Sequence, residues 1–199
     1  MMKKFLISAG LCLALAVPAY AEKLPLPEIS GYLNDLGSAS GAFTQINDDG
    51  TLSTGNIYIK RPGRVRFEYD PPDQALVVAG GGTVVIFDPK SNQSPETYPL
   101  KRTPLSIILA RNVDLGRAEM VVGHAYDGTS TIVTAQDPEN PEYGSIELVF
   151  TGDPVQLRKW VINDGSGGRT TVILGALETA ETLSDLLFNT QNIGEGSDR

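Results

Sequence analysis

Short strand signals follow one another almost without a break between residues 40 and 175. Apolar and polar side chains alternate with a period of two, as they do when one face of a β-sheet is buried and the other is exposed to solvent. Tight turns rich in Gly, Pro, Asn and Asp separate the signals and favour hairpins. The predicted strands are residues 40–46, 51–60, 64–70, 74–79, 83–88, 95–99, 118–126, 129–136, 144–151, 155–163 and 169–175.

Successive strands joined by hairpin turns predict an antiparallel meander. An open, flat sheet rarely holds about eleven strands, so the sheet is expected to curl. The expected fold class is therefore mainly β with short helices (α+β). We expect an incomplete, strongly curved antiparallel β-barrel of about eleven strands with an α-helical lid.

Three short apolar segments interrupt the strand pattern and predict the helices of that lid. Residues 24–36 carry apolar side chains at spacings of three and four, and residues 103–111 begin with a Thr-Pro helix start. Residues 182–189 predict a third helix, and the polar tail 190–199 is expected to fray. The helices are expected to cover the concave face. The proposed lid residues are Ile29, Leu33, Leu105, Ile108, Leu109, Leu186 and Leu187.

The hairpin of residues 55–72 has the clearest alternation in the chain. Its apolar side chains fall on one face and its charged side chains on the other. The apolar face is expected on the concave side, but periodicity leaves open which face points inward and whether the interior is filled or leaves a cavity that these side chains would line. The proposed lining residues are Ile57, Ile59, Val65, Phe67, Tyr69, Val77, Val85 and Phe87.

Residues 1–21 have the pattern of a cleaved secretory signal peptide. Lys3 and Lys4 precede an apolar run to Val17, and Ala19-Tyr20-Ala21 fits the small-x-small cleavage site. The run is too short to span a bilayer. We therefore expect export, and a single domain formed by residues 22–199.

Cysteine content and charge exclude several classes of function for the expected mature chain. The single cysteine, Cys12, lies within the signal segment, and Leu11 before it is too large for a lipid-attachment motif. Disulfides, thiolate nucleophiles and Cys-based metal sites are thereby excluded. Removing Lys3 and Lys4 changes the formal charge from −8 to −10 (−8 − 2). This charge disfavours nucleic acid and anionic membrane surfaces as partners.

The sequence offers little support for an enzyme. His124 is the only histidine, and neither a Gly-x-Ser-x-Gly elbow nor a His-Glu-x-x-His helix is present. The glycines at 80–82 lack the Lys-Ser/Thr of a phosphate-binding loop. Glu68 and Asp70 share a strand face and could pair as acid and base, but neighbouring arginines favour a charge ladder. We expect no catalytic residue, no metal and no cofactor.

Arg61, at the corner of the central hairpin, admits two interpretations. A surface cation at a sheet edge is statistically the commoner one. The alternative is a latch, in which the guanidinium donates hydrogen bonds to a helix end or to carbonyls of the lid.

The motifs of this chain resemble those of the LolA-type periplasmic lipoprotein carriers. The Lys-Arg-Pro corner is followed by Arg-x-Arg-Phe-Glu-Tyr-x-x-Pro within residues 55–72. Ala42-Phe43-Thr44-Gln45, the strand Val84 to Pro89 and Thr103-Pro104-Leu105 are similar in order and spacing. The chain departs from the pattern at residues 79–82, where an Asp-Gly turn is often found, and it lacks a long C-terminal extension.

The resemblance implies a periplasmic chaperone with a cavity for the acyl chains of triacylated lipoproteins. It implies a lipoprotein-releasing ABC complex in the inner membrane as donor and a lipoprotein acceptor in the outer membrane. It also implies that Arg61 binds the lid in the closed, empty form. We expect a monomer. The alternative on the same fold is an acceptor-like module of the outer membrane, or another lipid-binding or sensor module of the envelope.

Overall fold

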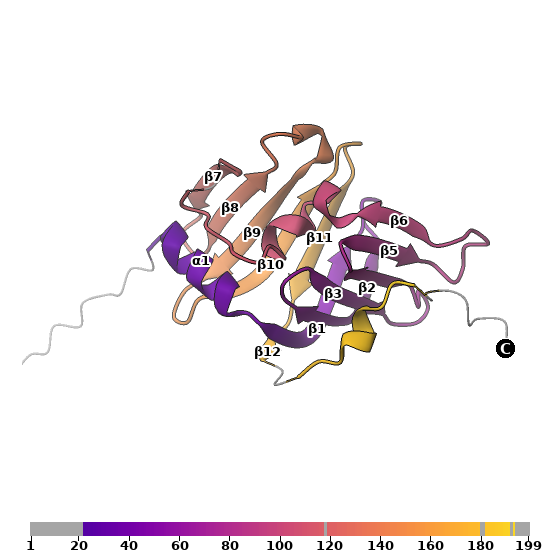
Figure 1. The fold of residues 1–199 in the computed structure, drawn as a ribbon. Helices are drawn as coiled ribbons and strands as arrows, with labels where there is room; N and C mark the ends of the chain where they lie inside the picture. The colour runs from indigo at the N-terminus through magenta and orange to yellow at the C-terminus, as the bar shows by residue number, and fades with distance from the viewer. Residues whose placement is uncertain (1–21, 118, 180–181, 192, 194–199) are drawn as a thin grey trace, which may run out of the picture.

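The computed structural model describes residues 22–117, 119–179, 182–191 and 193. The predicted signal peptide and most of the predicted tail lie outside the described residues. The strands form one antiparallel sheet in the order β6-β5-β4-β3-β2-β1-β11-β10-β9-β8-β7, and β12 pairs with β1. Because β6 and β7 do not pair with each other in this order, the barrel is incomplete (Figure 1).

The eleven predicted strands are all present, with ends shifted by a few residues, and the incomplete antiparallel barrel is confirmed. The short β12 was not predicted from the sequence. The strand bounds are β1 Ser38–Ile46, β2 Leu52–Lys60, β3 Arg64–Tyr69, β4 Leu76–Gly80, β5 Thr83–Phe87, β6 Glu96–Pro99, β7 Val121–Tyr126, β8 Thr131–Gln136, β9 Ser145–Thr151, β10 Gln156–Asn163, β11 Arg169–Leu174 and β12 Glu178–Thr179.

The helices are short, and they lie on both faces of the sheet. The helix α1 (Leu26–Asp35) is present as predicted, whereas residues 103–111 form only one α-helical turn, α2 (Leu105–Ile108). The 3-10 turns are η1 (Leu100–Arg102), η2 (Pro141–Tyr143) and η3 (Asp185–Phe188). Among the residues described, no helix combines the length and the apolar character that crossing a membrane requires.

The connection between β6 and β7 runs from one edge of the sheet to the other. Residues 100–117, here called the crossing segment, pass in front of the sheet on the same side as α1 (Figure 1). Apolar side chains of α1 and of the crossing segment join the buried core formed by the concave face. These buried residues are Ile29, Leu33, Leu100, Leu105, Ile107, Ile108, Leu109, Val113 and Leu115.

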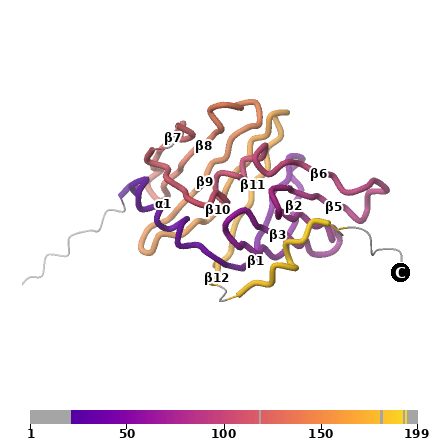
Figure 2. The backbone as a smooth tube through the Cα atoms, in the orientation of Figure 1, coloured from indigo at the N-terminus to yellow at the C-terminus, as the bar shows by residue number. Residues whose placement is uncertain are grey.

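The predicted third lid helix is wrong in both type and position. Residues 185–188 form a 3-10 turn, and this C-terminal segment runs beside β3 (Figure 2). Lys60 Nζ and Arg64 Nη1 each lie 2.6 Å from Asp185 Oδ1. Since these cations extend from the charged face of the hairpin, the turn covers the outer face rather than the concave one.

Candidate functional site

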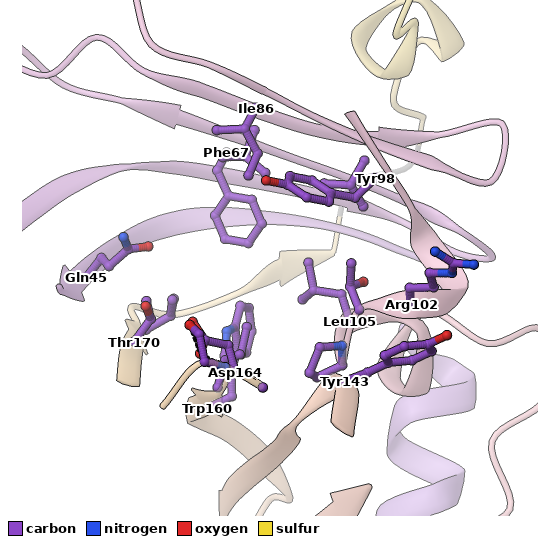
Figure 3. A pocket seen from close by; sticks show the side chains of 18 of the residues that line it. Gln45, Phe67, Ile86, Tyr98, Arg102, Leu105, Tyr143, Trp160, Asp164 and Thr170 are labelled. Carbon is purple, nitrogen blue, oxygen red and sulfur yellow. Dashed lines mark hydrogen bonds between the residues drawn. The ribbon is translucent and has the colours of Figure 1, made fainter. Parts of the chain in front are cut away.

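A cavity of about 460 Å³ opens on the concave face, between β3–β6 and the strands β10 and β11. Figure 3 shows Phe67, Ile86 and Tyr98 on one wall and Trp160 and Thr170 on the other. The crossing segment closes one end with Arg102, Thr103, Pro104 and Leu105. The remaining lining residues are Gln45, Tyr69, Val77, Val84, Tyr143, Ile162, Asp164, Gly165, Ser166 and Val172.

Strand alternation places the apolar wall of this cavity. In β3, Phe67 and Tyr69 face inward, while the alternate residues Arg66 and Glu68 form an ion pair of 2.6 Å on the outer face. Aromatic packing then sets the shape of the inner wall. The ring of Phe67 meets those of Phe43 at 5.4 Å and Trp160 at 6.1 Å, both edge to face. These contacts connect the two halves of the curved sheet.

The cavity also has several polar side chains in its lining. Tyr69 Oη donates to Gln45 Oε1 at 2.7 Å, and burial raises the pKa of Tyr69 to about 12. The guanidinium of Arg102 lies 5.9 Å from the ring centre of Tyr143, within cation–π range. Hydrogen bonds from Ser166, together with neighbouring backbone N–H groups, lower the pKa of Asp164. Asp164 is therefore ionised at neutral pH.

Arg61 joins the central hairpin to both elements that cover the concave face. Its Nη2 donates to Ala110 O of the crossing segment at 2.5 Å and lies 3.4 Å from Asn34 Oδ1 of α1. Its backbone N–H donates to Gly37 O at 2.8 Å. Asn34 Nδ2 donates to Val113 O at 2.8 Å, and Val113 N–H donates back to Asn34 Oδ1 at 2.9 Å. One guanidinium thus bridges two covering elements that also bind each other.

The environment of Arg61 makes this bridge costly to form. Burial lowers the pKa of Arg61, and its Nε is buried with no hydrogen-bond partner in the part of the chain that the structure describes. The side chain stays charged, since an arginine pKa is far above neutral. A buried donor without a partner offsets part of the energy gained at Ala110.

The proposed lining residues fall into three groups. Phe67, Tyr69 and Val77 line the cavity. Ile57, Ile59 and Val65 are buried in the core and do not line the cavity. The third group consists of Val85 and Phe87 on β5.

The placement of Val85 and Phe87 in the cavity wall is wrong. Val85 pairs with Val78, which pairs with Arg66 on the outer face. Their neighbours Val84 and Ile86 line the cavity instead. The pairing of Val77 with Ile86 could not be read from the sequence, because a one-residue shift in register across the turn at 80–82 moves every β5 side chain to the other face.

The proposed lid residues lie on two different faces of the sheet. Ile29, Leu33, Ile108 and Leu109 are buried against the concave face, and Leu105 in addition lines the cavity. Leu186 and Leu187 are not lid residues, since both belong to η3 on the outer face. Leu186 is 80% exposed, and Leu187 O accepts from Arg66 Nη1 at 3.0 Å.

The residues considered for catalysis have structural partners. His124 Nε2 lies 2.9 Å from Leu24 O and so ties the segment before α1 to β7. Glu68 pairs with Arg66. Within the described part of the chain, no three His, Cys, Asp or Glu side chains gather in a way that could hold a metal ion.

Comparison with known proteins agrees with this arrangement. The family described as outer membrane lipoprotein carrier protein LolA matches residues 34–191, well over half of the chain. The chain belongs to the LolA family. The outer-membrane lipoprotein carrier protein of Azotobacter vinelandii is 22% identical over 203 residues, 98% of this chain and 96% of its own length. That of Chromohalobacter salexigens is 25% identical over 205 residues, 98% of this chain and 95% of its own.

Solved structures resemble this LolA-family chain more loosely. The crystal structure of LolA superfamily protein NE2245 from Nitrosomonas europaea has a TM-score of 0.45 and 12% identity. It covers 83% of this chain and 98% of that chain. This likeness is too distant to support an argument about the site.

Proposed function

We propose that this protein carries lipoproteins across the periplasm and shelters their acyl chains in the concave-face cavity. The observation that supports this most directly is an apolar cavity, open to solvent, beside a covering segment that Arg61 hydrogen-bonds at Ala110. The relatives named outer-membrane lipoprotein carrier proteins support the same role. The cargo would be released from the inner membrane and delivered to the outer membrane.

The energetics of the cargo explain why such a cavity is needed. Each methylene of an acyl chain exposed to water costs about 0.8 kcal/mol, so several chains in an aqueous compartment cost tens of kcal/mol. A carrier has to offset most of this cost and still release its cargo. A covering segment that packs into the same apolar face competes with the cargo, and this competition keeps binding reversible.

Leu105 gives this competition a structural basis. It lines the cavity and is buried, and Ile108 and Leu109 after it fill the neighbouring concave face. Cargo chains that displace these side chains would replace one apolar contact by another. The Arg61 bridge to Ala110 would then bias the balance toward the covered state.

The proposed route determines which partners this protein needs. A lipoprotein-releasing ABC complex of the inner membrane would load the carrier, and an outer-membrane acceptor would unload it. Export through a cleaved signal peptide at residues 1–21 would place the chain between the two. The role requires no chemistry on the cargo, so the proposal is a binding protein and not an enzyme.

The test is transfer of an acylated cargo into solution. Inner-membrane vesicles that contain the ABC complex and a tagged triacylated lipoprotein are incubated with ATP and the purified protein. We expect the lipoprotein to leave the vesicles as a soluble complex with this chain. The same lipoprotein without its acyl chains is the control and should form no complex. Retention of the acylated form in the membrane would refute the proposal, as would equal binding of the acyl-free form.

A further inference from the structure

The cavity and the Arg61 bridge occupy different parts of the concave face. Neither Arg61 nor its partners Asn34 and Ala110 line the cavity, whose contact with the crossing segment is limited to residues 102–105. The chain runs five residues further from Leu105 to reach Ala110. A ligand could therefore occupy the cavity without breaking the bonds of Arg61.

The cavity also has a mouth that stays open while the Arg61 bridge is formed. Tyr98 and Arg102 on one side are exposed, as are the cavity residues 164–166 on the other. Figure 3 shows Arg102 at one end of the cavity, Tyr98 on the wall of Phe67 and Ile86, and Asp164 on the facing wall. No lid movement is needed for a slender molecule to enter between them.

The size of the cavity limits what the bridged form can hold. A volume of about 460 Å³ has room for roughly fifteen methylene-sized groups, if each takes about the 30 Å³ that a water molecule occupies in the liquid. This is close to one long acyl chain. Three chains need roughly three times that volume, and the buried side chains of the crossing segment occupy the adjoining space.

We propose that the bridged, closed protein binds one single-chain lipid, a free fatty acid or a lysophospholipid, without release of Arg61. A triacylated lipoprotein requires release of Arg61, because its further chains have to displace the crossing segment. The second half of this inference rests on the proposed function, whereas the first half stands without it. Binding of single-chain lipids is thus a second activity of the same fold, with its own dependence on the lid.

The response to loss of the bridge separates the two modes of binding. A ligand that binds only an open minor state has an apparent affinity reduced by the population of that state. Removing a bridge that disfavours opening by about 2- to 30-fold would tighten such binding by the same factor. The affinity of a ligand that binds the closed form does not change when the bridge is removed.

The experiment measures the dissociation constants of palmitate and of a palmitoyl lysophospholipid by titration calorimetry. The proteins are the mature chain, Arg61→Leu, and a matched pair of tryptophan variants. Ile86→Trp fills the cavity, and Ile173→Trp adds the same bulk on the outer face; the two isoleucines are 37% and 41% exposed. Thermal unfolding checks each variant, and Arg61→Met, which also lacks a donor, replaces Arg61→Leu if the latter does not fold.

We expect single-chain affinity to change by less than about twofold in Arg61→Leu, to fall at least tenfold in Ile86→Trp and to stay unchanged in Ile173→Trp. Binding of only one of the two lipids supports the inference and identifies the head group that the mouth accepts. Tightening by more than about twofold in Arg61→Leu would overturn the inference, and so would an equal loss of lipid affinity in both tryptophan variants. Failure of both lipids to bind while lipoprotein transfer proceeds refutes this inference alone. Failure of lipids and lipoprotein together refutes the proposed function as well.

Discussion

Replacing Arg61 by leucine removes the guanidinium that bridges the central hairpin to both covering elements. The bond from its Nη2 to Ala110 O, 2.5 Å long, is charge-assisted and contributes about 1.5–3 kcal/mol. The contact with Asn34 at 3.4 Å adds little. The buried Nε without a partner costs about 1 kcal/mol. The net bias toward the closed state is therefore about 0.5–2 kcal/mol.

This bias predicts a defect in unloading rather than in loading. A change of about 0.5–2 kcal/mol shifts the ratio of closed to open protein by roughly 2- to 30-fold. Because closure competes with the acyl chains, Arg61→Leu should hold triacylated lipoprotein roughly 2- to 30-fold more tightly than the unmodified protein. It should also release a correspondingly smaller fraction to acceptor-containing outer-membrane vesicles. The assay follows a tagged lipoprotein from the loaded, purified carrier to those vesicles.

Arg64→Leu is the matched control for this prediction. Arg64 belongs to the same hairpin and loses a comparable charge-assisted contact, with Asp185 at 2.6 Å, but on the outer face. Its lipoprotein affinity and release should match those of the unmodified protein. If Arg61→Leu releases cargo normally, or binds it more weakly, the latch role of Arg61 is wrong. If Arg64→Leu shows the same defect, the effect belongs to the hairpin and not to the bridge.

Three further predictions concern stability and the outer face. Gly31→Ala should raise the free energy of unfolding by about 0.5–1 kcal/mol in urea titration, since Gly31 lies inside α1 with open space around it; destabilisation would contradict this. Gly80→Ala should detach the C-terminal segment, because the new Cβ would lie 2.1 Å from Phe188 O. Hydrogen exchange of residues 182–191 should then rise, and unchanged protection would refute the packing. The unfolded Tyr69 ionises near pH 10 and the folded one at about 12, so its stabilisation is complete below pH 10 and lost as the pH rises to about 12. Urea midpoints of the unmodified protein should fall more over that interval than those of Tyr69→Phe; parallel curves would show that burial of Tyr69 is not responsible.

Local alternation in the sequence was sufficient to predict the strands. In β2 and β3, each inward apolar residue is flanked by polar or charged ones, and a single register satisfies both faces. The same reasoning predicted the buried face of α1, where Ile29 and Leu33 lie one turn apart. These features depend only on neighbours in the chain.

Local patterns failed where both faces of a strand are apolar. Every residue of β5 except Thr83 is apolar, so alternation did not distinguish Val84 and Ile86 from Val85 and Phe87. The segment before Asn189 is likewise apolar enough for a lid helix. Its position on the outer face is set instead by Lys60 and Arg64, which lie more than a hundred residues earlier in the chain.

By itself, then, the sequence determined the class of fold, because strand alternation and turn chemistry act over a few residues. Its family motifs also indicated Arg61 as a candidate functional residue. Only the tertiary structure decided where the cavity lies and what Arg61 touches. The cavity needs Phe67 and Trp160 in edge-to-face contact across the curved sheet, and Arg61 needs Ala110, 49 residues away. Such contacts depend on how the sheet curls and how the crossing segment spans it, and these depend on packing over the whole chain rather than on any local pattern.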